Sequence, residues 1–207
     1  ETETIDFDPA KQINLLHLSR GESAQLFSNK TVSATNYTGL SLLIEADTQE
    51  LDSYLEAPDG GQTSLILRSG ASTTVNQEFV VKDDKDRSLV LHFDLRSSLY
   101  PLEDNATDQE LAPKLRLLIG SEYGQVSGDL NEQVLLDGNC STDTSDEIGH
   151  VIYVYAGNDV EPDDIDGISP EPVSTALLRR SDTRADYVAS YLSPGDYTLA
   201  VTCEADQ

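Results

Sequence analysis

The apolar residues of this chain fall into short runs, and the best of these runs alternate apolar and polar side chains. The alternation is clearest in residues 88–95 and 114–119. Its apolar members are Leu89, Leu91, Phe93 and Leu95 in the first run, and Leu115, Leu117 and Ile119 in the second. A period of two is typical of a strand that buries one face. Turn residues separate such runs roughly every 8–12 residues, and no long amphipathic helix stands out, so the sequence predicts an all-β protein.

We expect two β-sandwich domains in tandem, Ig-like or prealbumin-like, at residues 1–122 and 123–207. The boundary is placed in the glycine-containing stretch at residues 120–124. The first part carries 21 acids and 10 bases, a net charge of −11, and the second carries 17 acids and 3 bases, a net charge of −14. The shorter part is therefore the more acidic one.

Several local elements follow from the same reasoning. Residues 12–18, 40–46 and 133–136 are expected to be strands, and Pro58-Asp59-Gly60-Gly61 is expected to form the turn of a hairpin. The polar stretch at residues 101–112 is expected to be a long surface loop. Ser193-Pro194-Gly195-Asp196 is expected to be a tight turn.

The net charge of −25 limits the partners of this chain. Such a field repels phosphate backbones, so nucleic acid is not expected as a partner. No apolar run approaches the roughly 18 residues of a membrane-spanning helix. The sequence contains no methionine, not even at position 1, which indicates a removed leader or a missing N-terminal part.

Cys140 and Cys203 are the two cysteines, and their even number and wide spacing favour a disulfide. The bridge would close a loop of 203 − 140 = 63 residues, which the chain-entropy argument values at roughly 4 kcal/mol. Two buried free thiols are the main alternative, and a metal pair is a remote one. A disulfide places the protein in the periplasm or outside the cell.

No catalytic constellation stands out. The three histidines, His17, His92 and His150, are scattered, and a zinc site needs three or four ligands within reach. A G-x-S-x-G elbow is absent from the sequence, and tryptophan, a common sugar platform, is absent as well. We therefore do not expect an enzyme.

The best candidate for ligand chemistry is an acidic loop that contains Asp163, Asp164 and Asp166, followed by Gly167. Calcium loops place carboxylates at alternating positions before a glycine, because the ion needs six to eight oxygen ligands. These three aspartates are weak calcium candidates, and calcium is the only cofactor expected. The alternative is an ordinary solvated turn.

Several stretches, taken in order, resemble the bacterial family called domain of unknown function 4382. Residues 13–18 are similar to its "DLL-x-L" opening strand, and residues 32–43 keep the Ala and Tyr of its second motif. Residues 92–99 (HFDLRSSL) match its "DFDLRKSL" motif well, and residues 114–117 are similar to its closing strand. The resemblance covers about residues 10–120. In the second half, residues 125–128 and 192–199 are similar to motifs of small prealbumin-like or carboxypeptidase-regulatory-like sandwiches.

The resemblance implies a Gram-negative envelope or extracellular setting, with a lipid anchor on a missing N-terminal part, and it supplies no catalytic residues. The family's usual first strand is absent, which predicts either a missing part of the chain or a vacant sheet edge. We therefore expect a structural or adhesive protein whose copies exchange strands to build a fibre, with residues 1–10 as donor. The alternative is a calcium-dependent surface module that binds a ligand or polysaccharide.

Overall fold

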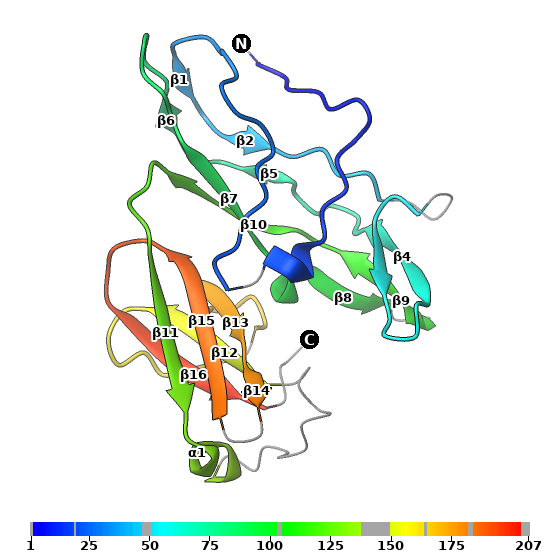
Figure 1. Cartoon of the computed structure of the whole chain (residues 1–207), viewed down its shortest axis with the longest axis vertical. Coiled ribbons are helices and arrows are strands. Elements are labelled where there is room, and N and C mark those ends of the chain that lie inside the picture. The colour runs from blue at the N-terminus through cyan, green and yellow to red at the C-terminus, as the bar shows by residue number, and fades with distance from the viewer. Residues whose placement is uncertain are drawn as a thin grey trace. The chain divides into compact units, whose positions relative to one another are not determined.

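The computed structural model describes residues 2–18, 20–46, 51–102, 105–137, 150–163, 165–181 and 184–203 (Figure 1). Strands make up nearly all of its regular structure, so the all-β prediction is confirmed. The chain divides into two compact units. Unit 1 comprises Glu1–Leu15 and Ala24–Ser121, and unit 2 comprises Leu16–Ser23 and Glu122–Gln207. The segment Leu16–Ser23 is termed the strap; it belongs to unit 2 although its chain neighbours on both sides belong to unit 1.

Unit 1 contains one four-stranded sheet and three strand pairs. The sheet has the order β3 (Tyr54–Glu56), β4 (Gln62–Leu67), β9 (Asn105–Leu111) and β8 (Leu99–Leu102), and β4 and β9 are parallel. Two of the pairs are short: β1 (Asn36–Tyr37) with β6 (Phe79–Val80), and β2 (Leu40–Ser41) with β5 (Thr74–Val75). The expected hairpin is confirmed, because β3 and β4 are antiparallel and Gly60 adopts a φ of 84° in the turn between them.

The third pair, formed by β7 (Leu89–Asp94) and β10 (Lys114–Ile119), is the most regular part of unit 1. Opposite residues in an antiparallel pair lie on the same face. One face of this ribbon is therefore apolar throughout, with Leu115 opposite Phe93, Leu117 opposite Leu91 and Ile119 opposite Leu89. The other face places Arg116 opposite His92 and Lys114 opposite Asp94, and at its far end it places the buried Leu118 opposite Val90. The sequence predicted both strands and both faces.

A buried serine connects the end of β7 with the start of β10. Ser98 is fully buried within the 3-10 turn Arg96–Ser98. Its hydroxyl donates to the carbonyl of Asp94 and accepts from the backbone N–H of Lys114 at 2.9 Å. Its carbonyl accepts from the N–H of Ala112 at 2.8 Å. One short side chain thus satisfies backbone groups of both strands.

Three expectations for the first half of the chain are wrong. Residues 101–112 are not a loop but contribute β8 and β9, because backbone pairing with β4 does not require apolar side chains. Residues 12–18 form no strand; Leu15–Leu18 is a 3-10 turn, whose three-residue period puts half-buried Leu15 and Leu18 on one side. Residues 40–46 pair only at β2, and the side chain of Leu43 is 92% exposed.

Unit 2 is a sandwich of two three-stranded sheets (Figure 1). One has the order β11 (Gly124–Leu130), β15 (Arg184–Leu192) and β14 (Arg179–Ser181). The other has the order β13 (Ser174–Leu177), β12 (Val151–Ala156) and β16 (Tyr197–Thr202). The core between them includes Leu135, Ile152, Val154, Ala189 and Leu192.

Strand β12 is buried on both faces. Ile152 and Val154 point into the core between the sheets, whereas Val151, Tyr153 and Tyr155 form a second cluster on the outer face. Such a continuous apolar strand needs cover on both sides. The outer cover comes from the loop after β12, whose Val160 and Ile165 pack against this second cluster.

One local expectation for unit 2 needs correction. Residues 133–136 were expected to be a strand but lie in helix α1 (Glu132–Asp137). The side-chain oxygen of Asn131 accepts from the N–H of Gln133 at 3.0 Å, so Asn131 acts as the N-cap that starts this helix. The short turn at residues 193–196 joins the end of β15 to the start of β16, and these two strands lie in different sheets.

The connection made by Ser98 can be tested by removing its hydroxyl. Ser98→Ala leaves the N–H of Lys114 without its acceptor and opens a gap at a fully buried position, so we expect a loss of about 2 kcal/mol of unfolding free energy. Chemical denaturation of the full chain measures this change. Ser121→Ala, at an exposed position, serves as control and should shift stability by less than about 0.5 kcal/mol. Equal effects of the two variants would contradict the role given to Ser98.

Candidate functional site

The acidic loop predicted as a calcium site is a structured cover for the outer face of β12. The hydroxyl of Tyr155 donates to the carbonyl of Asp163 and accepts from the N–H of the same residue at 3.2 Å. The N–H of Val160 donates to the hydroxyl of Thr198 at 3.1 Å. Burial raises the pKa of the Tyr155 phenol above its ordinary value. The phenol therefore stays neutral and remains available as a donor.

Carboxylates of this loop cap its own backbone. The carboxylate of Glu171 accepts from the N–H groups of Asp166, at 3.1 Å, and Gly167. The carboxylate of Asp166 accepts from the N–H of Ile168 at 2.8 Å. Gly167 has a φ of 87°, which a residue with a side chain adopts only at a cost. These contacts give two acidic residues of the loop a structural role.

The calcium prediction stays a prediction. Asp163 and Asp166 lie in the described loop, and Asp164 lies outside the described residues. In the parts of the chain that the structure describes, no three His, Cys, Asp or Glu side chains are grouped as metal ligands.

Only one cysteine of the predicted disulfide lies in the described residues. Cys203 lies directly after β16 and packs against the core of unit 2. Cys140 lies outside the described residues, so the pairing of Cys140 with Cys203 remains a prediction.

The histidines are not brought together. His17 lies in the strap, His92 in β7, and buried His150 just before β12. Burial, reinforced by the positive charge of Arg116, lowers the pKa of His92 to about 4, and Asp94 opposes this shift. His92 is therefore neutral near pH 7.

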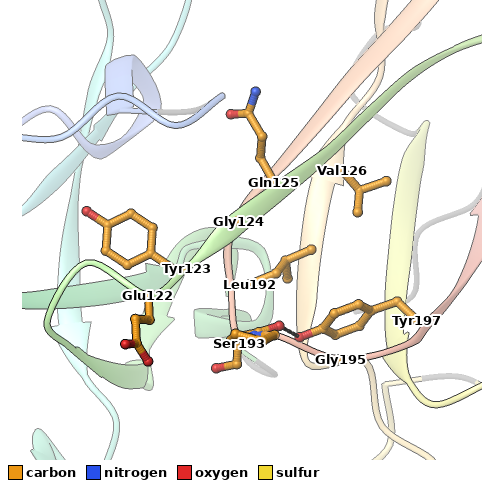
Figure 2. A pocket seen from close by; sticks show the side chains of 10 residues that line it. Glu122, Tyr123, Gly124, Gln125, Val126, Leu192, Ser193, Gly195 and Tyr197 are labelled. Atoms are coloured by element: carbon orange, nitrogen blue, oxygen red, sulfur yellow. Dashed lines mark hydrogen bonds between the residues drawn. The ribbon is translucent and has the colours of Figure 1, made fainter.

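A groove open to solvent lies at one end of the unit 2 sandwich, with a cavity volume of about 420 Å³ (Figure 2). It is lined by Glu122, Tyr123, Gly124, Gln125, Val126, Leu192, Ser193, Pro194, Gly195 and Tyr197. Val126, Leu192 and Tyr197 extend the core to the groove, and the hydroxyl of Tyr197 donates to the carbonyl of Ser193. A Cβ on Gly124 would have no heavy atom within 4 Å. The groove thus offers apolar contact, with Glu122 as the one carboxylate in its lining.

Residues 1–113 match the family described as Domain of unknown function (DUF4382), which is 113 of the 207 residues. The chain belongs to this family. No curated protein and no solved structure gives a significant match. The resemblance of the first half to the DUF4382 family, predicted from its motifs, is thereby confirmed. In the described residues, no helix is long and apolar enough to cross a membrane.

The most specific DUF4382 motif of the chain has a structural role. It spans the last rungs of β7, the 3-10 turn and the first residue of β8, and it contains the buried Ser98. The N–H of Ser97 donates to the carboxylate of Asp94 at 3.2 Å. The motif therefore ends one strand and positions the next. Sequence reasoning did not identify the groove, whose one visible signal is Gly124 two residues before the apolar Val126.

The low pKa of His92 predicts a pH-dependent stability. The unfolded chain binds a proton at His92 as the pH falls through about 6.5, whereas the folded chain does so only near pH 4. The stability is therefore fully present above pH 6.5 and falls between pH 6.5 and 4, by about 1–2 kcal/mol at pH 5. His92→Gln should remove this part of the fall in denaturation at pH 7 and pH 5. The exposed His17→Gln should keep the wild-type fall, and identical profiles of wild type and His92→Gln would refute the assignment.

The capping role of Glu171 predicts a different pattern. Glu171→Ala removes the acceptor of two backbone N–H groups, so we expect a loss of about 1–2 kcal/mol in thermal or chemical unfolding. Glu171→Gln retains an amide oxygen in the same place and should lose less than half as much. Glu161→Ala, at an exposed position of the same loop, controls for the removal of negative charge. A Gln variant as unstable as the Ala variant would argue against the capping role.

Proposed function

We propose that this chain is a non-enzymatic structural or adhesive protein of the bacterial cell envelope or cell exterior, whose copies associate by β-strand exchange into a fibre. The observation that carries the proposal is the outer edge of β7. Within the described residues, β7 pairs with β10 alone, while β5 lies beside β10. In the described residues no strand pairs with the outer edge of β7, and we infer that this is the acceptor edge.

The hydrogen-bond pattern shows which backbone groups face this edge. The N–H of Gly120 donates to the carbonyl of Ser88 at 2.8 Å, so these opposite residues form a hydrogen-bonded rung. Rungs alternate in an antiparallel pair, and the intervening residues turn their N–H and C=O groups outward. On β7 these residues are Leu89, Leu91 and Phe93. Their side chains lie on the apolar face of the ribbon, so an added strand would gain both backbone pairing and apolar contact.

The segment before the strap is suited to act as the donor. Ile5 and Phe7 are half-buried, whereas Thr4 and Asp6 are exposed. This alternation, which sequence reasoning did not recognise, is that of a strand. The segment forms no strand within its own unit. Side chains hold it against the unit: the carboxylate of Glu3 accepts from the N–H of Ser33 at 3.1 Å, and the ammonium group of Lys11 donates to the carbonyl of Gln25 at 3.4 Å.

The setting outside the cytoplasm rests on the family and on the cysteine pair. The DUF4382 resemblance implies a Gram-negative envelope lipoprotein, and the predicted Cys140–Cys203 disulfide requires an oxidising compartment. The acidic surface fits a protein that must remain soluble at high local concentration. The second half contributes a sandwich that resembles prealbumin-like modules of exported proteins.

Strand exchange is tested with two charge-matched variants of the full chain. Ile5→Asp with Phe7→Asp places charges on the face that would contact β7, so we expect monomers where the wild type forms concentration-dependent multimers. Thr2→Asp with Thr4→Asp adds the same charge at exposed positions and should assemble like the wild type. Light scattering and negative-stain images give the readout. A wild type that is monomeric at every concentration would refute the self-assembly.

A further inference from the structure

The strap, Leu16–Ser23, is held on strand β15 of unit 2 by side-chain contacts. The guanidinium group of Arg20 forms an ion pair with the carboxylate of Asp186. The hydroxyl of Tyr191 donates to the carbonyl of Gly21 at 2.9 Å and also lies 3.3 Å from the carbonyl of Glu22. The contacts combine charge with backbone recognition, which gives both affinity and register.

The backbone of the strap lies close against β15. A Cβ on Gly21 would lie 2.8 Å from the hydroxyl oxygen of Ser190, closer than real Cβ contacts. Asp186 and Ser190 have the same parity on β15, opposite to that of the core residues Ala185 and Ala189. The strap therefore covers the outer face of this sheet, and a side chain at position 21 would have to displace the hydroxyl of Ser190.

Both partners are strained where they meet. Arg20 has a φ of 67° and Tyr191 a φ of 59°, the left-handed region that non-glycine residues adopt at a cost of roughly 1–2 kcal/mol. Tyr191 is the extra residue of a β-bulge, because Gly124 pairs with Leu192 and Gln125 already pairs with Ser190. Strained residues persist where surrounding contacts determine them, and they gather at functional contacts.

The strap and the residues of β15 that bind it are joined to unit 1 through different parts of the chain, so the strap can be regarded as a donor and β15 as its acceptor. The strap is joined to unit 1 at both of its ends, through the bonds from Leu15 to Leu16 and from Ser23 to Ala24. Its acceptor residues on β15 are joined to unit 1 through the bond from Ser121 to Glu122. Gly120, with a φ of 82° and no heavy atom near its Cβ position, precedes this connection. A different backbone course at this connection would therefore let the strap reach the acceptor of another copy without breaking a covalent bond.

We propose that the strap exchanges between copies of this chain: it docks on β15 of a second copy in place of that copy's own strap, so that each copy donates one strap and accepts another. This inference deepens the self-assembly proposed above, but it uses a surface other than the edge of β7. Donor and acceptor are different surfaces, so the contact is head-to-tail and need not close into a dimer. The exchanged contact keeps the same charge complementarity, because residues 123–207 of either copy carry a net charge of 3 − 17 = −14 and receive the cationic Arg20.

Reversing one charge at a time in the full chain tests the exchange. Arg20→Glu sets two negative charges against each other within its own chain, and Asp186→Arg sets two positive charges against each other. A strap from one variant and an acceptor from the other are complementary in both directions. We therefore expect the equimolar mixture to associate at least tenfold more tightly than either variant alone, in sedimentation or light-scattering experiments. The double variant Arg20→Glu with Asp186→Arg should behave like the wild type and shows that the reversed pair is compatible with folding.

A covalent trap gives a second, independent measurement. The Cβ position of Gly21 lies 3.4 Å from the Cβ of Ser190, close to the separation in disulfides. Mixing Gly21→Cys with Ser190→Cys under mild oxidation should produce covalent heterodimers, several-fold above the dimers of either variant alone.

The outcomes separate this inference from the proposed function. Mixtures that associate no better than their components, with no heterodimer in the trap, would overturn strap exchange even if the wild type forms fibres. A chain that still forms multimers after Ile5→Asp with Phe7→Asp, beside an associating mixture, would refute strand addition at β7 and support strap exchange. A monomeric wild type would overturn both.

Discussion

The burial of β12 on both faces is the constraint on which unit 2 depends. Its inner face forms the core of the sandwich, and its outer face needs the loop that carries Val160 and Ile165. The acids of that loop that the structure describes keep contact with water while these two apolar side chains are partly buried. The hydrogen bonds of Tyr155, Asp166 and Glu171 fix the loop in a shape that satisfies both requirements. Two acidic residues of unit 2, Asp166 and Glu171, thus help to shape the loop that covers β12.

Unit 1 depends on a smaller set of interactions. Of the buried apolar residues, five belong to unit 1 and twelve to unit 2, within the part of the chain that the structure describes. The five are Leu65, Phe79, Leu111, Leu117 and Leu118. The regular β7–β10 ribbon and the hydrogen bonds of Ser98 therefore carry much of the order of this unit.

The sequence was most informative where a side-chain pattern and the structure have the same cause. The alternation in residues 88–95 and 114–119 predicted β7, β10 and their apolar face, because burial selects side chains every second residue. It failed for residues 101–112, because the strand β9 is held by backbone pairing with β4. It also failed for α1, where Asn131 sets the start of a helix in a stretch too short to show a period. The contacts of the strap and the groove were not predicted from the sequence, for a similar reason. They depend on Gly21 and Gly124, whose role is the absence of a side chain and becomes visible only beside the residues they meet.

The thin core of unit 1 and the two proposed contacts between copies have a common physical basis. A strand added to the edge of β7 would contact the half-buried side chains of that strand, and each Å² of apolar surface removed from water contributes about 25 cal/mol. Binding to the folded state also stabilises that state through mass action. A unit with few buried residues of its own gains more from such contacts, relative to its total stability, than a unit with a full core. Unit 2, with the fuller core, is in turn the better acceptor, because it can hold Tyr191 in its strained conformation ready for the strap. On this argument the two units have different roles in the proposed assembly: unit 1 supplies the unpaired edge of β7, and unit 2 supplies the rigid face of β15 that binds the strap.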